Sequence, residues 1–458
     1  MSIKLTDFNH IFFIGIAGAG MSALAQYLKG IGKVISGSDR YFLPTEPNEI
    51  RSKLEAEGIQ CFSQDGSGIT KETQLVIVST AIEDTVDEVV KAKELGIPLM
   101  KRSELLALIC ESKKTIAVAG TSGKSSTAGM LYHVLESAGL DPSIITGAGL
   151  TSLIKEGKIG NAKVGKGDWL IIEADESDGS IVQYRPEIGL LLNIDKDHQP
   201  LEELFPLFNT FKSNTKGLFI TNLSNDNSKL LSSGEHRDFG FETPEAYFNA
   251  TDLKQEQFKI EFQLRGVNFT MNALGQHSVE NATAAIAVAQ SIGVDLNICA
   301  RSIAQYEGIY RRHQILGEKN GVWVIDDYAH NPAKCAASIA ACQPVAKKVI
   351  AWFQPHGYGP TRFLRDEFVK QISNILRGDD EIWMSEIYYA GGSAKKDISA
   401  KDLILDIQAE GKNAYFIENR EELLSSMRSH ITEDSVILLM GARDPGLESF
   451  AREFYQNL

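Results

Sequence analysis

A glycine-rich stretch at residues 115–127 has the residue types of a loop that binds phosphate. An apolar run of strand length leads into it, and a helix-compatible stretch follows. Gly120 and Gly123 allow a tight turn, so that backbone N–H groups converge at the start of a helix, where the helix dipole favours an anion. Lys124 adds a mobile positive charge for nucleotide phosphates, and the Ser125 hydroxyl is placed to ligate Mg²⁺. We interpret the stretch as an ATP site; because only two residues separate its glycines, a plain glycine turn is the alternative.

Acidic side chains follow two further apolar runs, at the points where strands are expected to end. The run at 169–172 leads into an acidic segment that begins with Glu173, and the run at 188–194 leads into one that ends with His198. In an open parallel sheet, such strand ends lie at the edge where ligands bind, beside the glycine-rich loop. Carboxylate oxygens there can hold Mg²⁺, and a histidine can take a further coordination position. The sequence thus predicts a metal site; a solvated acidic face and a structural histidine are the alternatives.

A second glycine turn lies near the start of the chain, after an apolar run at 11–16. Its glycines follow the pattern G-x-x-G-x-G, which is typical of a dinucleotide fold but lacks the dehydrogenase fingerprint. Asp39 ends the next expected strand, where such folds hold a ribose hydroxyl. Taken alone, this turn leaves a nicotinamide cofactor, and with it a dehydrogenase, as an open alternative.

Apolar runs alternate with helix-compatible stretches along most of the chain, which is typical of α/β domains with parallel sheets. Strands are expected at 11–16, 34–36, 75–79, 97–100, 115–119, 169–172, 188–194, 322–325, 349–353, 381–385, 414–417 and 436–440. Residues 225–270 are more polar, and short alternating runs there predict a small antiparallel sheet. The length suits about three domains, expected at 1–111, 112–316 and 317–458. We expect the first and last to be Rossmann-like and the central one to be a P-loop domain that carries the small sheet.

The composition restricts the class of protein. Lysine and arginine number 46 against 60 acidic residues, so the net charge is −14 and binding to nucleic acid or to an anionic membrane surface is disfavoured. The five cysteines are scattered without a C-x-x-C pair, which predicts reduced core thiols in a cytosolic protein. No apolar stretch reaches the length of a membrane span and the N-terminus lacks a secretory pattern, so we expect a cytoplasmic protein.

Four short motifs carry a resemblance to a known family. They are G-I-A-G-A-G-M-S at 15–22 with G-S-D at 37–39, V-S-T-A-I at 78–82, A-V-A-G-T-S-G-K-S at 117–125 and E-A-D-E-S-D at 173–178. Together they resemble the Mur ligases, ATP-dependent amide-forming enzymes of peptidoglycan synthesis, and the resemblance spans essentially the whole chain. Within the family, the motifs are most similar to those of the members that add L-alanine to UDP-N-acetylmuramate.

The resemblance implies roles for individual residues. Lys124, Glu173 and His198 match residues that act in catalysis, and Ser125 joins the last two as a metal ligand. Arg312 matches an arginine that contacts the nucleotide. The residues matched to the ATP site are Gly120, Thr121, Ser122, Gly123, Lys124, Ser125, Ser126, Asn281, Arg312, Asp327, His330 and Asn331. The residues matched to the site of the UDP portion are Gly15, Ala17, Gly18, Ala19, Gly20, Met21, Ser38 and Asp39. This second match displaces the nicotinamide alternative.

The chain departs from the family pattern chiefly in the region expected to bind the amine. The family's Q-P-H-R-Y-T-R-T-R is Q-P-H-G-Y-G-P-T-R at 354–362. Gly357 and Pro360 therefore replace two arginines expected to meet the carboxylate of the incoming amino acid or the acyl phosphate. The family's H-N-A-L-N is H-S-V-E-N at 277–281. These departures hardly touch the use of ATP, whereas they leave open which amino acid or peptide is added.

The resemblance implies an ATP-dependent ligase that joins L-alanine to the lactyl carboxylate of UDP-N-acetylmuramate through an acyl phosphate, with Mg²⁺, in the cytoplasm. The expected partners are UDP-N-acetylmuramate and an amino acid or short peptide, without nucleic acid or membrane, and the expected state is a monomer or homodimer. Two alternatives stay open. One is a murein-peptide ligase that adds a recovered peptide or a different amino acid, and the other is a nucleotide-binding homologue without ligase activity.

Overall fold

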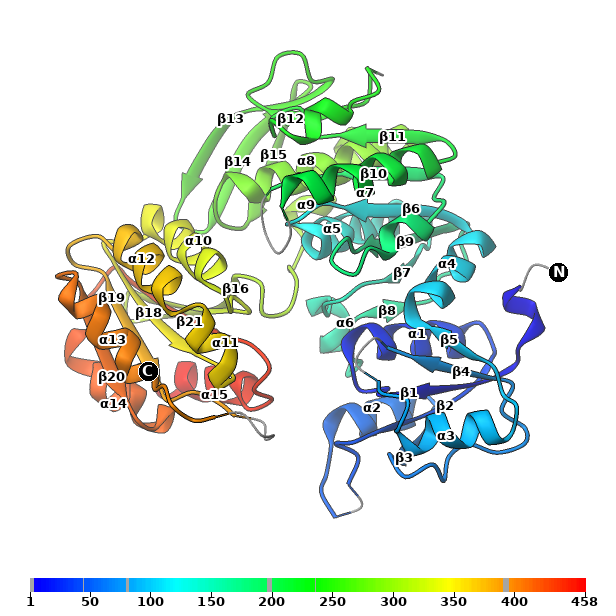
Figure 1. Ribbon diagram of the computed structural model, residues 1–458. Helices are drawn as coiled ribbons and strands as arrows, with labels where there is room; N and C mark the ends of the chain where they lie inside the picture. Colours follow the sequence, from blue (N-terminus) through cyan, green and yellow to red (C-terminus); the bar gives the residue numbers. More distant parts are fainter. Residues whose placement is uncertain (1–3, 44, 80–81, 196–199, 235, 390–394) are drawn as a thin grey trace. The chain divides into compact units, whose positions relative to one another are not determined.

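The computed structural model describes residues 4–43, 45–79, 82–195, 200–234, 236–389 and 395–458 (Figure 1). It confirms an α/β fold with several mostly parallel sheets. The chain forms two compact units: Met1–Leu253, Glu261–Met271 and Gln276–Tyr310 make the first, and Lys254–Ile260, Asn272–Gly275 and Arg311–Leu458 make the second. The first unit contains two large sheets, so the division into three domains stays a prediction. None of the helices in these ranges is both long and apolar enough to cross a bilayer.

The first sheet of the first unit has five parallel strands in the order β3-β2-β1-β4-β5. The strands are β1 (His10–Ile14), β2 (Val34–Asp39), β3 (Gln60–Ser63), β4 (Leu75–Val78) and β5 (Leu99–Lys101), and the helices are α1 (Ala19–Gly30), α2 (Glu49–Ala56), α3 (Asp87–Glu94) and α4 (Arg102–Ser112). Phe12 and Phe13 of β1 point to opposite faces of the sheet, and both are fully buried. Burial on both faces explains why β1 reads as a continuous apolar run.

The second sheet of this unit has the strand order β11-β10-β6-β9-β7-β8, and all its pairs but β7 with β8 are parallel. The strands are β6 (Lys114–Ala119), β7 (Ser143–Ile145), β8 (Ala162–Lys163), β9 (Trp169–Ala174), β10 (Ile188–Leu191) and β11 (Leu218–Thr221). The helices are α5 (Lys124–Ser137), α6 (Thr151–Lys155), α7 (Leu201–Asn214), α8 (Gln276–Ser291) and α9 (Leu296–Ala304). Because β6 lies between β9 and β10, the segments that follow these three strands meet at one sheet edge, as the sequence predicts.

The two sheets of the first unit share one hydrophobic core. Leu24 of α1 and Leu105 of α4 belong to the same buried cluster as Ile172 of β9. A polar contact reinforces this packing, because the amide of Asn161 donates to the carbonyl of Ala19 at 2.7 Å, at the start of α1. The first glycine turn is therefore held against the sheet that carries the phosphate-binding loop.

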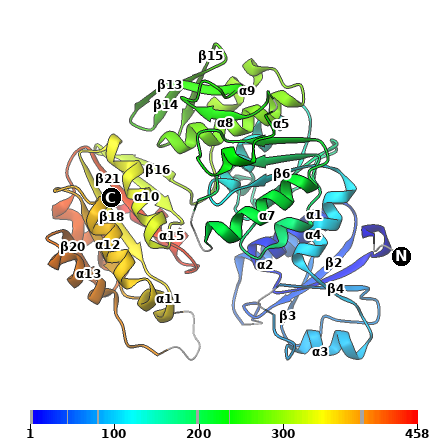
Figure 2. The same ribbon diagram turned by 45° about the horizontal axis from the view of Figure 1, so that its top comes forward.

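The small sheet after β11, of which Figure 2 labels β13, β14 and β15, differs from the predicted pattern at its fourth strand, which lies at one edge. Strands β13 (Phe248–Glu256), β14 (Lys259–Leu264) and β15 (Val267–Asn272) are joined by two-residue turns, which make neighbouring strands antiparallel. Strand β12 (Phe239–Phe241), which packs against α8, instead pairs with β13 in parallel. After a turn in which the N–H of Ala246 donates to the carbonyl of Thr243 at 2.9 Å, the N–H of Phe248 donates to the carbonyl of Asp238 at 3.0 Å. The chain thus returns to the start of β12 before β13 begins, which makes the two strands parallel.

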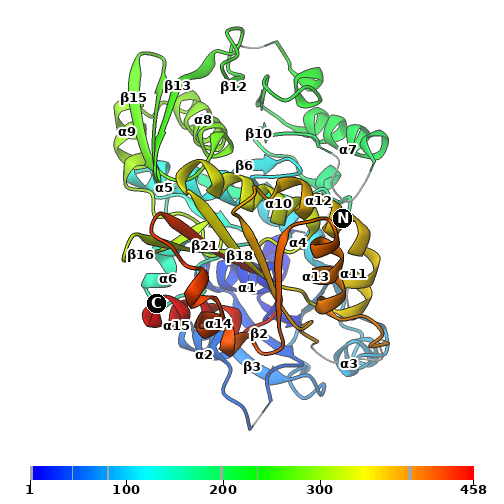
Figure 3. The ribbon, with the colours of Figure 1, turned by 90° about the vertical axis from the view of Figure 1, so that its left-hand side faces the viewer.

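The second unit is built around a six-stranded sheet with the order β16-β17-β21-β18-β19-β20 (Figures 1 and 3). The strands are β16 (Gln314–Lys319), β17 (Val322–Asp327), β18 (Lys348–Gln354), β19 (Glu381–Ser385), β20 (Asn413–Ile417) and β21 (Ser435–Gly441). The helices are α10 (Pro332–Cys342), α11 (Tyr358–Phe363), α12 (Arg365–Ile375), α13 (Ala400–Ala409), α14 (Leu423–Met427) and α15 (Leu447–Asn457). Only β16 is antiparallel to its neighbour. Ala351 of β18 packs in the cluster that holds α10, α12 and α13, and Trp352 packs in the cluster that holds α14 and α15, so helices cover both faces.

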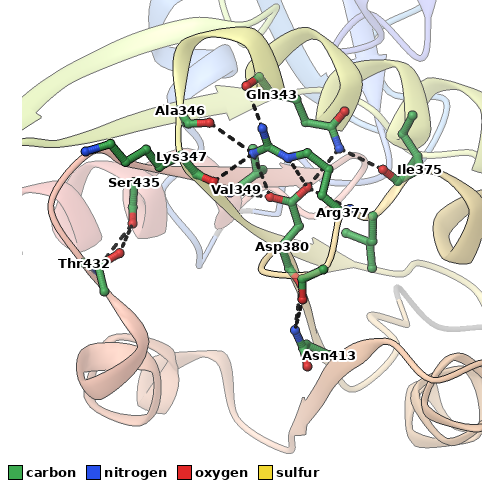
Figure 4. A network of polar contacts seen from close by, with 12 residues as sticks. Gln343, Ala346, Lys347, Val349, Ile375, Arg377, Asp380, Asn413, Thr432 and Ser435 are labelled. Atoms are coloured by element: carbon green, nitrogen blue, oxygen red, sulfur yellow. Dashed lines mark hydrogen bonds and ion pairs between the residues drawn. The ribbon is translucent and has the colours of Figure 1, made fainter.

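A buried carboxylate fixes the approach to β19 in this unit (Figure 4). The side chain of Asp380 is fully buried and accepts hydrogen bonds from the Val349 N–H at 2.8 Å and from the Gln343 amide at 2.9 Å. The guanidinium of Arg377 pairs with the same carboxylate at 2.9 Å. Burial would raise the pKa of Asp380, but these partners hold it below its usual value.

All five cysteines of the chain are buried and unpaired, which confirms the prediction of free core thiols.

Candidate functional site

The loop between β6 and α5 requires glycine at two positions. Gly120 and Gly123 have φ angles of 140° and 83°, a region that L side chains rarely adopt. A Cβ on Gly120 would lie 3.1 Å from the backbone N of Asn193, and one on Gly123 would lie 2.5 Å from the Asn281 Oδ1 atom. The loop therefore wraps closely around its neighbours and leads directly into the first turn of α5. The first N–H groups of a helix have no partner within the helix and, together with the helix dipole, they favour an anion at this position, as the sequence predicts.

The ammonium group of Lys124 is held at this loop by two oxygen atoms. Its Nζ atom donates to the carbonyl of Gly120 at 2.6 Å and to the Oε2 atom of Glu176 at 2.8 Å. Asp175 lies farther from the same Nζ, at 4.0 Å. The side chains of Lys124 and Glu176 are 15% and 8% exposed, whereas that of Asp175 is 43% exposed. A positive charge thus stands at the predicted phosphate position, with Glu176 as a partner that the sequence alone did not single out.

Glu173 lies at the end of β9, opposite Val118 of the neighbouring β6. Its carboxylate accepts a hydrogen bond from the Ser125 hydroxyl at 3.0 Å and one from the Gly147 N–H at 2.7 Å. The hydroxyl of Thr146 donates to the Oε1 atom, the oxygen that also accepts the Gly147 N–H, whereas Ser125 contacts Oε2. Two of the three predicted metal ligands, Ser125 and Glu173, are thereby brought together.

The donor set at this point fits magnesium. A serine hydroxyl and a glutamate carboxylate supply the hard oxygen atoms that Mg²⁺ prefers. The third predicted ligand, His198, lies outside the described residues. Among the residues that are described, no group of three or more His, Cys, Asp or Glu side chains could hold a metal ion. The fit therefore rests on Ser125 and Glu173, with substrate oxygens and water left to complete the coordination.

Asn193 fixes the tip of the phosphate-binding loop and was not predicted. Its Oδ1 atom accepts bonds from the Ser122 N–H and the Thr121 hydroxyl, both at 2.9 Å, and its Nδ2 atom donates to the carbonyl of Ser122 at 3.2 Å. The sequence feature that could have identified Asn193 is its position, since it follows the buried strand β10 and precedes the acidic segment.

Asn281, which the resemblance assigned to the nucleotide, accepts a hydrogen bond from the Thr127 hydroxyl at 3.2 Å. It therefore lies beside the loop, on α8.

The first glycine turn is organised by Asp39. Its two carboxylate oxygens accept bonds from the Ala17 N–H and the Tyr41 N–H, each at 3.0 Å, and the residue is only 6% exposed. Asp39 thus holds the turn that precedes α1, and its contact with a ligand hydroxyl stays a prediction.

Arg102, which was not predicted, packs on the first turn of α1. Its guanidinium lies 3.2 Å from the position that a Cβ atom on Gly20 would occupy. A basic side chain at the start of a helix strengthens a site for an anion.

The remaining predicted nucleotide contacts belong to the second unit. Asp327 is buried and accepts bonds from the His313 N–H at 3.0 Å and the Ala329 N–H at 2.7 Å. The guanidinium of Arg312 lies 5.2 Å from the ring centre of Tyr328. Asp327 therefore fixes the backbone directly after Arg312 and directly after Tyr328. The nucleotide contacts of Asp327 and Arg312 stay predictions.

Two histidines lie near each other after β17 and β18, with ring centres 6.1 Å apart. His330 contacts the carbonyl of Tyr328 through Nδ1 at 2.9 Å, and burial lowers its pKa. Burial, and then the charges of Arg443 and His330, lower the pKa of His356 to about 4. The buried Nδ1 atom of His356 finds no hydrogen-bond partner in the described part of the chain. Both rings are therefore neutral at pH 7.

Asn331, another residue matched to the ATP site, caps α10 by accepting the N–H of Lys334 at 2.9 Å.

The structure explains the unusual residues at 357 and 360. Gly357 has a φ of 74° and a ψ of 125°, which an L side chain adopts only under strain, and its N–H donates to the carbonyl of Tyr388 at 2.8 Å. Pro360 lies in the first turn of α11, where a missing N–H is tolerated. The two departures thus belong together, because they define a turn in which arginine at position 357 would be strained.

Comparison with known proteins identifies the family of the chain. Family models described as the Mur ligase catalytic domain, the Mur ligase middle domain and the Mur ligase glutamate ligase domain match residues 10–114, 118–289 and 311–443. A UDP-N-acetylmuramate–L-alanine ligase of Carboxydothermus hydrogenoformans is 35% identical over 96% of this chain and 95% of its own length.

Two solved structures share the fold. A UDP-N-acetylmuramate–alanine ligase from Thermotoga maritima matches with a TM-score of 0.80 and 26% identity over 98% of both chains. A murein peptide ligase from Psychrobacter arcticus matches with a TM-score of 0.67 over 98% of both chains, at 20% identity, which speaks for the fold alone. From the three family models and the full-length relative, we conclude that the chain belongs to the Mur ligase family.

Proposed function

We propose that this protein is an ATP-dependent ligase that joins L-alanine to the lactyl carboxylate of UDP-N-acetylmuramate in peptidoglycan precursor synthesis. The observation that carries the proposal is that Lys124, Ser125 and Glu173 lie together at the β6–α5 loop. The chain is also 35% identical to a UDP-N-acetylmuramate–L-alanine ligase. The first glycine turn, held by Asp39, is the proposed site of the UDP portion.

The proposed reaction has two steps. The substrate carboxylate attacks the γ-phosphate of ATP, which forms an acyl phosphate and releases ADP. The amine then attacks the acyl carbon, which forms the amide and releases phosphate. Lys124 places a positive charge where negative charge moves during phosphoryl transfer, and the N–H groups at the start of α5 hold the phosphates. Mg²⁺, held by Ser125, Glu173 and the predicted ligand His198, would supply further charge neutralisation.

The identity of the amine is the part of the proposal that needs its own test. A turn with Gly357 and Pro360, in place of two arginines that the family resemblance leads one to expect, favours a second candidate, a ligase that adds a recovered peptide or a different amino acid. The protein is incubated with UDP-N-acetylmuramate, Mg-ATP and one amine at a time: L-alanine, other amino acids, or a tripeptide that begins with L-alanine. Phosphate release is the readout.

Fastest release with L-alanine supports the first candidate, and fastest release with the tripeptide supports the second. Absence of amine-dependent release with every candidate would favour a nucleotide-binding homologue without ligase activity. We place the reaction in the cytoplasm, where ATP and sugar nucleotides are available, and we expect a monomer or homodimer, which sedimentation of the purified protein distinguishes.

A further inference from the structure

The pairing of Lys124 with Glu176 has a consequence for the proposed nucleotide site. The ammonium of Lys124 lies 2.8 Å from the Oε2 atom of Glu176, and both side chains are largely buried. Glu176 belongs to the segment that follows β9, three residues beyond the proposed metal ligand Glu173. A phosphate that binds at the loop needs the same ammonium group. Glu176 and the phosphate therefore compete for Lys124.

Breaking this pair is unfavourable, because it leaves a carboxylate of 8% exposure without its counter-ion and beside a polyanion. The penalty depends on the charge of the incoming nucleotide. Metal-free ATP carries about two more negative charges than its magnesium complex, so repulsion by Glu176 acts more strongly on the metal-free form. Magnesium near Ser125 and Glu173 would offset the charge that Lys124 no longer neutralises.

We propose that Glu176 is a positioning residue that competes with nucleotide phosphates for Lys124 and thereby makes the site discriminate against nucleotide without magnesium. The inference rests on the proposed function, because it assigns the β6–α5 loop to ATP. It adds a role for one carboxylate that is not among the predicted metal ligands or substrate contacts. Loss of its charge frees Lys124 and removes the repulsion at the same time.

The test measures ATP affinity by displacement of a fluorescent nucleotide from the full-length protein, once with EDTA and once with excess Mg²⁺. Glu176→Gln keeps the size of the side chain and removes its charge. It is expected to bind metal-free ATP about tenfold more tightly than the wild type and Mg-ATP less than about threefold more tightly. Asp175→Asn is the matched control, since it removes the same charge from a side chain that is farther from Lys124 and more exposed. It should change both affinities by less than about twofold.

Several outcomes overturn the proposal. Glu176→Gln could bind metal-free ATP no more tightly than the wild type, or gain equally under both conditions, or match the effect of Asp175→Asn. Should the glutamine variant fold poorly, Glu176→Asp retracts the carboxylate from Lys124 and is expected to bind metal-free ATP about threefold more tightly. A wild type that binds no ATP, with or without magnesium, contradicts the proposed function itself. ATP binding that depends on Lys124 but not on Glu176 contradicts this inference alone.

Discussion

The hydroxyl of Ser125 donates a hydrogen bond to the carboxylate of Glu173 at 3.0 Å, although 48 residues separate them in the chain. The contact arises because β6 and β9 are parallel neighbours, so the segment after β6 lies beside the end of β9. A hydroxyl in the first turn of α5 and an acid on the neighbouring strand of the sheet are thus brought to one point.

Replacement of Lys124 by alanine should abolish ATP-dependent ligation. Loss of the charge that stabilises the transferring phosphoryl group is expected to lower kcat by about a thousandfold or more. Binding of UDP should persist, because the turn held by Asp39 belongs to the other sheet of the first unit. Phosphate release measures the first effect and titration with UDP the second. Turnover close to that of the wild type would remove the proposed mechanism.

Glu173→Gln should raise the magnesium concentration needed for half-maximal activity by at least about tenfold, because a neutral amide is a weaker metal ligand than a carboxylate. The amide oxygen can still accept the Gly147 N–H, so the fold around β7 should be kept. A magnesium titration of phosphate release checks the effect, with circular dichroism as the folding control. An unchanged titration would mean that the acidic segment does not hold the metal.

Gly123→Ala should impair nucleotide binding as well as stability. The new Cβ would lie 2.5 Å from Asn281 Oδ1, in a backbone conformation with a φ of 83°. Gly139→Ala is the matched control, because Gly139 has a φ of 76° but no atom within 4 Å of its Cβ position. Both variants should lose about 1–2 kcal/mol of stability from backbone strain, measured by urea unfolding. Only Gly123→Ala should weaken ATP binding, by about tenfold or more; an equal loss of affinity in both would contradict the close packing of the loop.

His356 should make the second unit less stable in mild acid. Its pKa of about 4 in the folded protein lies below the value of ~6.5 expected in the unfolded chain. The unfolded chain therefore binds a proton between these pH values while the folded protein does not, so stability is present above pH ~6.5 and is lost as the pH falls toward 4. We expect this group to contribute about 1–2 kcal/mol of that loss, given its partial exposure.

The check is the free energy of unfolding measured at several pH values for the wild type and for His356→Gln. The variant should show a shallower loss of stability between pH 6.5 and pH 4. His236→Gln, which removes an exposed histidine of the first unit, serves as the control and should follow the wild type. Identical slopes for the wild type and His356→Gln would show that the ring is not kept neutral by its surroundings.

Local sequence was sufficient to predict the elements that carry the chemistry. A fully buried parallel strand such as β21 contains a continuous apolar run, because helices cover both of its faces. The role of Gly120 and Gly123 in a tight turn could also be predicted from the sequence, since the turn from a strand into an anion-binding helix tolerates few other residues. The short strands β7 and β8 were missed, because a few residues carry too little periodic signal.

What the sequence by itself determined is the type of each predicted site: a loop with the residues of a phosphate site, an acid at a strand end and a glycine turn matched to the UDP portion. Only the tertiary structure decided which partners each group has, because those partners come from distant segments. Glu176 reaches Lys124, Asn193 fixes the loop tip and Arg102 packs on α1 only because strand order and helix packing bring separate segments together. Such contacts depend on the burial of many apolar side chains at once, which no single stretch of sequence records.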